Sequence, residues 1–127
     1  MNEFVKLTLE KAKECVEDTK TLIDANRPNA ALSRAYYAMF HSAQAVLLTK
    51  NITAYTHQGV NIQFNKHFIK TGIFEKQITT EYNKILDQRL KSDYEIGFNA
   101  SLINAQNAYE RAMEFFSVIE NYIKELA

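Results

Sequence analysis

Two short segments of the sequence combine residue types that can bind phosphate and move protons. The first spans residues 33–41, where Arg34, Tyr37 and His41 are spaced three and four residues apart. On a helix this spacing places the three side chains on one face. An arginine can bind phosphate, and a histidine with its ordinary pKa of about 6.5 can transfer a proton near neutral pH. A structural interpretation is also open: Tyr37 packs, and Arg34 and His41 form hydrogen bonds in or near the core, because an unpaired buried arginine is costly.

The second segment spans residues 87–94. Arg89 and Asp93 are four positions apart, so they share a helix face and can form an ion pair. Tyr94 follows about 100° further around the same helix. The alternative here is a surface ion pair that contributes under ~1 kcal/mol, with Tyr94 in the core.

The distribution of charge is more informative than its sum. Fifteen basic and fifteen acidic residues cancel, which argues against a protein that coats nucleic acid in bulk. Residues 25–74 contain no Asp or Glu, however, and they hold all three histidines together with Arg27, Arg34, Lys50, Lys66 and Lys70. This pattern indicates a confined anion site. It is equally consistent with acidic residues that merely favour the outer helices.

Several kinds of reactive site are excluded by absent motifs. The sequence has no Glu-x-x-His, which carboxylate-bridged di-iron bundles need. One cysteine and three scattered histidines do not give a zinc spacing, and the three glycines are isolated from one another, so no glycine-rich phosphate loop exists. Neither Ser nor Cys stands in a nucleophile signature. We therefore expect no metal and no cofactor.

The compartment is predicted from the same residues. Cys15 is the single cysteine and cannot form an internal disulfide, which favours a reducing environment. The first residues are charged and lack the apolar region of a signal peptide. No run of about 18 apolar residues could span a membrane. We expect a cytoplasmic protein without membrane contact.

The elements that must position these residues are predicted to be helices. Apolar residues recur at three-and-four spacing near both ends of the sequence, and residues 28–50 are apolar on all sides, as in a buried helix. The predicted helices cover residues 2–24, 28–50, 57–70, 79–94 and 99–126. We expect one all-α domain over residues 1–127, an antiparallel bundle of four main helices plus one short helix.

Taken in order, these segments resemble the HEPN family of bacteria and archaea. The resemblance covers about residues 11–123 and rests on Ser33–His41, then His57, then residues 66–72, then Arg89 with Asp93 and Tyr94. It implies a four- or five-helix bundle, usually a homodimer with its functional groove at the subunit interface. Many members are metal-independent ribonucleases, often toxins that are neutralised by a minimal nucleotidyltransferase. Others bind nucleotides or act as non-catalytic partners.

The ribonuclease members of the family carry an Arg, four to six residues, then a His. The motif's Arg matches Arg89, but Tyr94 stands where the His is expected and Leu90 replaces a polar residue. Arg34 and His41 satisfy the bare spacing on an earlier helix. The preferred catalytic set is therefore His41 with Arg34 and Arg89.

The resemblance also implies residues that contact RNA or nucleotide, together with partners. The expected contacts are Tyr37, His57, Asp93, Tyr94, Lys66 and Lys70. A homodimer and a minimal nucleotidyltransferase antitoxin are the expected protein partners, and Tyr94 could be a target for nucleotidylation by that antitoxin. Three interpretations remain open: a ribonuclease toxin, a non-catalytic nucleotide- or partner-binding module, and a structural helical interaction domain.

Overall fold

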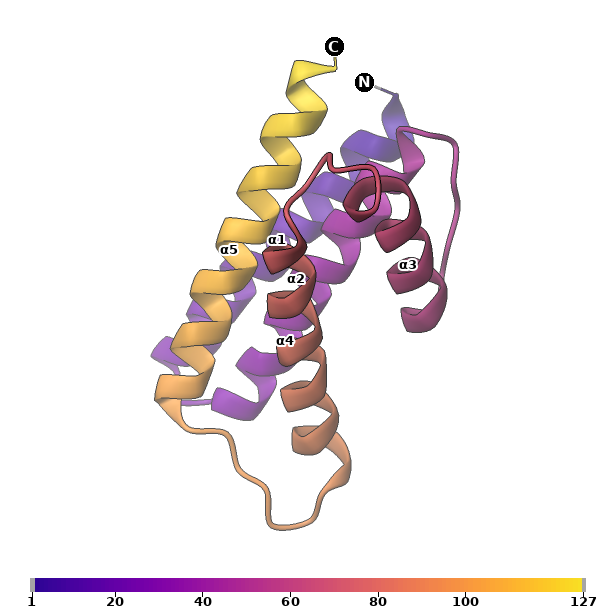
Figure 1. The fold of residues 1–127 in the computed structure, drawn as a ribbon. Helices are drawn as coiled ribbons and strands as arrows, with labels where there is room; N and C mark the ends of the chain where they lie inside the picture. Colours follow the sequence, from indigo (N-terminus) through magenta and orange to yellow (C-terminus); the bar gives the residue numbers. More distant parts are fainter. Residues whose placement is uncertain (1, 127) are drawn as a thin grey trace.

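The computed structural model describes residues 2–126, which form helices and no strands (Figure 1). Its elements are α1 (Glu3–Asp24), α2 (Pro28–Leu48), α3 (His57–Phe64), a one-turn π-helix η1 (Asn65–Ile69), α4 (Lys76–Tyr94) and α5 (Leu102–Glu125). The predicted all-α bundle of four main helices and a short one is confirmed.

The bundle is antiparallel and α2 lies at its centre. Figure 1 shows α1 and α2 running in opposite directions, as do α4 and α5, with the short α3 set to one side. Helix α2 packs against α1, α3, α4 and α5. Its central position follows from its sequence, because it buries residues on most of its circumference, including Leu32, Tyr36 and Met39 at 0% exposure.

The outer helices bury most of the apolar stripes expected from their spacing, although Leu126 at the end of the α5 stripe is 55% exposed. In α1 the stripe of Val5, Leu9, Ala12 and Val16 is buried. In α5 three alanines are buried in the first half and Phe115, Phe116, Ile119 and Ile123 in the second. Small side chains allow close approach of α5 to α2 at one end of the bundle, and large ones fill the core at the other.

The helix limits differ from the predicted ones most clearly at three places. Helix α5 begins at Leu102, because Ser101 and Asn104 form a reciprocal capping box there. Helix α4 begins at Lys76. The predicted third helix over residues 57–70 is divided into α3 and the π-turn η1, in which the amide of Lys70 donates to the carbonyl of Asn65.

An asparagine ties the α4–α5 connection to the start of α2. The Oδ1 atom of Asn29 accepts hydrogen bonds of 2.9 Å from both the Ser92 hydroxyl and the Ala100 amide. This contact fixes the end of α4, which carries Asp93 in its last turn and Arg89 just before it, against α2. Local spacing could not have predicted it, because it joins positions 63 and 71 residues apart.

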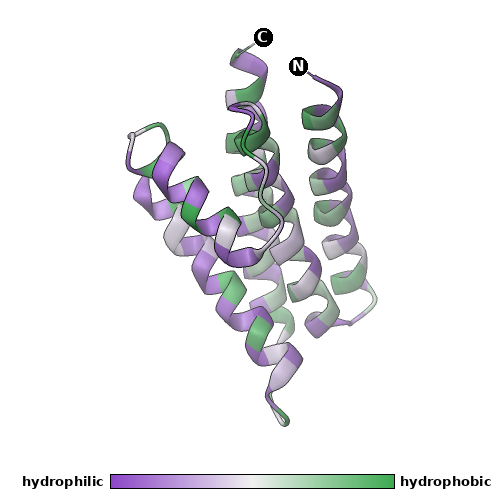
Figure 2. Cartoon of the chain, turned by 90° about the vertical axis from the view of Figure 1, so that its right-hand side faces the viewer, coloured by the Kyte–Doolittle hydropathy of each residue, from purple (hydrophilic) through white to green (hydrophobic). Residues whose placement is uncertain are grey.

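Figure 2 shows hydrophilic and hydrophobic residues interspersed along the helices, as expected where the outer helices turn one face to a shared core. Among residues 2–126, no helix is both long enough and apolar enough to cross a membrane.

Candidate functional site

The site is built around the ring of Tyr37 on α2, which two arginines contact. The guanidinium carbon of Arg34 lies 5.0 Å from the ring centroid, and that of Arg89, from α4, lies 5.1 Å from it. Arg34 and Tyr37 are one helical turn apart, as the sequence predicted. Both guanidinium groups are always charged. Two positive charges from different helices therefore lie against the same ring.

Arg89 is largely enclosed, with 13% of its side chain exposed. Its Nη2 donates a 3.3 Å hydrogen bond to the Tyr37 hydroxyl, and its guanidinium also lies 5.4 Å from the ring of Tyr36. Its Nε lies 3.1 Å from Oδ2 of Asp93, so the predicted ion pair is confirmed. That N–H is not directed at the carboxylate, however, and Nε is buried without a hydrogen bond. The contact with Asp93 is thus electrostatic.

The charged side chains of this cluster do not neutralise one another. Asp93 faces Arg89 with 34% of its side chain exposed, while Arg34 has a weak 4.0 Å contact with the sulfur of Cys15. Two guanidinium groups and one carboxylate leave a local excess of positive charge. Because like charges held near one surface repel, an anion bound between them is favoured.

His41 stands one turn beyond Tyr37, with its ring stacked at 5.9 Å on that of Tyr37. The orientation of the Gln44 amide decides which His41 nitrogen carries the proton. Gln44 donates through Nε2 to the carbonyl of Ala54 at 2.8 Å, so its Oε1 faces Nδ1 of His41, also at 2.8 Å. Nδ1 must then be the donor, which leaves Nε2 as an unprotonated acceptor. Burial lowers the pKa of His41, which favours the neutral ring.

His57, the first residue of α3, joins the same cluster. Its ring centroid lies 5.1 Å from that of Tyr36 and 6.3 Å from that of Tyr37, and its Nδ1 is hydrogen-bonded to the Tyr36 hydroxyl. Burial, followed by the charge of Arg89, lowers its pKa. The structure therefore assembles Arg34, Tyr37, His41, His57, Arg89 and Asp93, from α2, α3 and α4.

Three of the predicted contact residues lie apart from this cluster. Tyr94 is 76% exposed, so the alternative that places it in the core is wrong. Lys66 and Lys70, on and just after η1, are exposed. Within residues 2–126, no hydrogen bond, ion pair or cation–π contact joins any of the three to the cluster.

Three residues that hold the cluster in place were not among those predicted from the sequence. Tyr36 and Tyr82 are buried with their hydroxyl oxygens 3.3 Å apart, and Gln44 orients His41. A signal for Tyr82 exists, since it precedes Arg89 by seven positions and so lies on the same face of α4.

Two cavities lie near these helices. One of about 360 Å³ is lined by Gln44, by Ala54 and by the exposed aromatic residues Phe4 and Tyr55. It adjoins the site through Gln44, which contacts His41.

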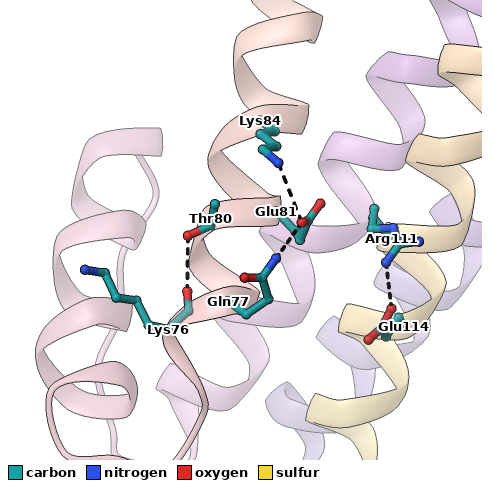
Figure 3. Close-up of polar contacts among 7 residues, drawn as sticks. All are labelled: Lys76, Gln77, Thr80, Glu81, Lys84, Arg111 and Glu114. Carbon is teal, nitrogen blue, oxygen red and sulfur yellow. Dashed lines mark hydrogen bonds and ion pairs between the residues drawn. The ribbon is translucent and has the colours of Figure 1, made fainter.

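The other cavity, of about 340 Å³, opens between α4 and α5 and has an apolar floor that includes Phe74 and Phe115. Figure 3 shows its charged rim. There Glu81 accepts from Gln77 at 2.8 Å and pairs with Lys84 at 3.9 Å, and Arg111 pairs with Glu114 at 3.3 Å. Glu81, Arg111 and Glu114 on its rim have partners on their own helices, so the α2–α4 cluster is the better candidate site. Over residues 2–126, no three His, Cys, Asp or Glu side chains are grouped so as to hold a metal ion.

Comparison with protein families gives a match to the HEPN domain over residues 5–122. Among curated relatives, a protein of Thermotoga maritima named "UPF0332 protein" is 33% identical over 99% of this chain and 98% of its own length. Two proteins of Methanocaldococcus jannaschii carry the names "Putative toxin MJ0605" and "Putative toxin MJ0142". The first is 36% identical over 74% of this chain and 70% of its own length, and the second 31% identical over 95% and 82%.

Among solved structures, TT1696 from Thermus thermophilus superposes with a TM-score of 0.81, covering 95% of this chain and 98% of that one. At 12% identity the likeness concerns the fold alone. It agrees with the all-α bundle described above.

Proposed function

This chain belongs to the HEPN family, and we propose that it acts on RNA at the α2–α4 cluster as a metal-independent endoribonuclease. The observation that carries the proposal is the placement of Arg34 and Arg89 about 5 Å from one tyrosine ring, beside a neutral histidine. Two guanidinium groups bind a phosphodiester and stabilise negative charge on its oxygens. A neutral imidazole accepts a proton.

The chemistry needs only these groups. Nε2 of His41 takes the proton of a ribose 2′-hydroxyl, and that oxygen attacks the adjacent phosphorus. The bond from phosphorus to the 5′-oxygen breaks, and the leaving oxygen takes a proton from water. Arg34 and Arg89 stabilise the charge that develops on the phosphoryl oxygens. His41 thereby takes the role that the family's ribonuclease motif gives to a histidine on the helix of Arg89, where this chain has Tyr94.

The cavity beside His41 supports RNA over a simple phosphate as the ligand. Phe4 and Tyr55 are 73% and 81% exposed at its edge, although large aromatic side chains are usually buried. Exposed aromatic rings stack on unpaired bases of single-stranded RNA. We place an RNA base in this cavity, which adjoins His41 through Gln44.

The assembly is part of the proposal. The chain forms a homodimer that presents two copies of the cluster to one groove, as family membership implies. Two relatives named as putative toxins support a role as a toxin. The partner in this proposal is a minimal nucleotidyltransferase antitoxin. Tyr94, exposed at the end of α4, is the residue that such an enzyme would modify.

A non-catalytic nucleotide- or partner-binding role is the second candidate. The observation that favours it is the tyrosine at position 94 in place of the family's motif histidine. Such a module would bind nucleotide or RNA at the same arginines without turnover.

The test is RNA cleavage by purified protein in EDTA. Wild type is compared with His41→Gln and Arg89→Lys, and with His67→Gln as a control histidine outside the cluster. Circular dichroism checks that each variant is folded. We expect cleavage by wild type and the control, and a loss of about 100-fold or more in the two cluster variants. RNA binding without cleavage by folded wild type would instead establish the binding module.

A further inference from the structure

Two buried tyrosines form a hydrogen-bonded chain that ends on His57. The hydroxyl oxygens of Tyr82 and Tyr36 are 3.3 Å apart, and the Tyr36 hydroxyl is hydrogen-bonded to Nδ1 of His57. Tyr36 is 0% exposed and Tyr82 is 3% exposed. Such buried hydroxyls need partners, because an unpaired buried donor is costly.

The direction of the protons along this chain follows from Tyr82. Within residues 2–126, Tyr36 is the one hydrogen-bond partner of the Tyr82 hydroxyl. If Tyr36 donated to Tyr82, the proton of Tyr82 would have no acceptor. Tyr82 therefore donates to Tyr36, and Tyr36 donates to Nδ1 of His57. Burial raises the pKa of Tyr36 to about 12, so this hydroxyl keeps its proton at neutral pH.

The surroundings of His57 disfavour a charged ring, because burial and then the charge of Arg89 lower its pKa. Tyr36, Tyr37 and Phe40 contact it from α2, and Arg89 on α4 is the charged group that acts on it. An imidazolium would also carry a proton on Nδ1, so charging the ring would break the hydrogen bond in which Tyr36 donates to that nitrogen. With Nδ1 accepting from Tyr36, the single proton of the neutral ring must be on Nε2.

The Nε2 atom of His57 is open to solvent beside the proposed RNA site. Within residues 2–126, this nitrogen has no hydrogen-bond partner and is not fully buried. The rings of His57 and His41 lie 5.3 and 5.5 Å from the same ring, that of Phe40. The two histidines thus have opposite tautomers at one site, with Nε2 an acceptor in His41 and a donor in His57.

We propose that His57 donates a hydrogen bond from an uncharged Nε2–H to a phosphoryl oxygen of bound RNA, and that Tyr36 and Tyr82 fix it in that tautomer. The inference rests on the proposed function, which supplies the phosphate. It assigns the two histidines different tasks: His41 removes a proton, and His57 positions the phosphate. The contact does not require a charged imidazole, so it persists above the pH at which an imidazolium would lose its proton.

The tautomer is tested without any ligand. Nitrogen-15 NMR of the imidazole rings distinguishes protonated from unprotonated nitrogens in wild type and in Tyr36→Phe, which removes the hydroxyl and keeps the ring. At pH 7 we expect the His57 proton on Nε2 alone in wild type, and a mixture of tautomers in Tyr36→Phe. A proton on Nδ1 in wild type, or the same tautomer in both proteins, would overturn the inference whether or not the protein cleaves RNA.

The phosphate contact is tested with a short single-stranded 2′-O-methyl RNA, which binds but cannot be cleaved by 2′-hydroxyl attack. The amide of His57→Gln reaches about as far as Nε2 and can still donate, whereas that of His57→Asn reaches only about as far as Nδ1. We expect an affinity within about threefold of wild type for His57→Gln and a loss of about tenfold or more for His57→Asn. Equal affinity of all three folded proteins would overturn the phosphate contact and leave the proposed function standing. If folded wild type did not bind this RNA, both the phosphate contact of His57 and the proposed function would be contradicted.

Discussion

Arg89 of α4 donates a hydrogen bond to the hydroxyl of Tyr37 of α2 across 52 residues of sequence, and its guanidinium also lies 5.1 Å from the centre of the same ring. Tyr37 already contacts Arg34 from its own helix. One ring thus links the two segments that the sequence marked as separate candidates for chemistry. The position of α4 against α2 therefore determines whether the site exists.

Asn29 controls that position, so removing its side chain should weaken both the fold and the site. In Asn29→Ala, the Ala100 amide and the Ser92 hydroxyl each lose the oxygen to which they donate. We expect the free energy of unfolding to fall by about 1–3 kcal/mol, and the last turn of α4 to exchange its amide hydrogens faster. Urea unfolding and hydrogen exchange measure the two effects. The control is Asn83→Ala, at an exposed position of α4. An equal effect of this variant would contradict the role assigned to Asn29.

The lowered pKa values of His41 and His57 predict how stability depends on pH. In the unfolded chain each histidine titrates at about 6.5, whereas burial lowers both pKa values in the folded protein. Below about pH 6.5 the unfolded state therefore binds more protons, and the free energy of unfolding falls as the pH decreases toward 5.

The measurement is the urea midpoint at pH 7.5 and at pH 5 for wild type and for the double variant His41→Gln with His57→Gln. We expect a smaller loss of stability in the double variant, because it has lost both groups that bind extra protons on unfolding. The same loss in both proteins would show that other groups account for the pH dependence.

Much of the fold could be predicted from the sequence because helix periodicity is local. The stripe of α1, the apolar circumference of α2 and the shared face of Arg34, Tyr37 and His41 all depend on spacings of three and four residues. The ion pair of Arg89 with Asp93 is of the same kind, and the structure confirms it.

The remaining features could not be predicted, since they depend on which helices become neighbours. The contact of Tyr36 with Tyr82 joins positions 46 residues apart, and that of Tyr36 with His57 joins positions 21 apart. The exposure of Tyr94 is also a tertiary property. Tyr94 comes directly after Asp93 on α4, and helix periodicity alone allowed its side chain to lie either in the core or at the surface.

The cavity beside His41 gives a prediction about RNA in particular. In Tyr55→Ala the ring that would stack on a base is absent, while Arg34, Arg89 and His41 are unchanged. We expect the affinity for a short single-stranded 2′-O-methyl RNA to fall by about five- to tenfold, with inorganic phosphate binding unaffected. Fluorescence anisotropy measures the first and isothermal titration the second.

The control for the Tyr55 variant is Ile62→Ala, another exposed apolar residue but on α3 and outside this cavity. Its affinity for the RNA should match that of wild type. Should Tyr55→Ala bind RNA as wild type does, bases would not lie in this cavity.

The central claim is that Arg34 and Arg89, from two helices, serve one anion. It is tested most directly by the affinity for a short 2′-O-methyl RNA of wild type, Arg34→Gln, Arg89→Gln and the double variant, with Arg111→Gln as a matched control on α5. We predict a loss of about tenfold for each single variant and non-additive losses for the pair, with a coupling of at least about 0.5 kcal/mol, because both arginines contact the same phosphate. Additive losses would place the arginines at separate phosphates. Folded variants that bind RNA as tightly as wild type and the control would contradict the claim.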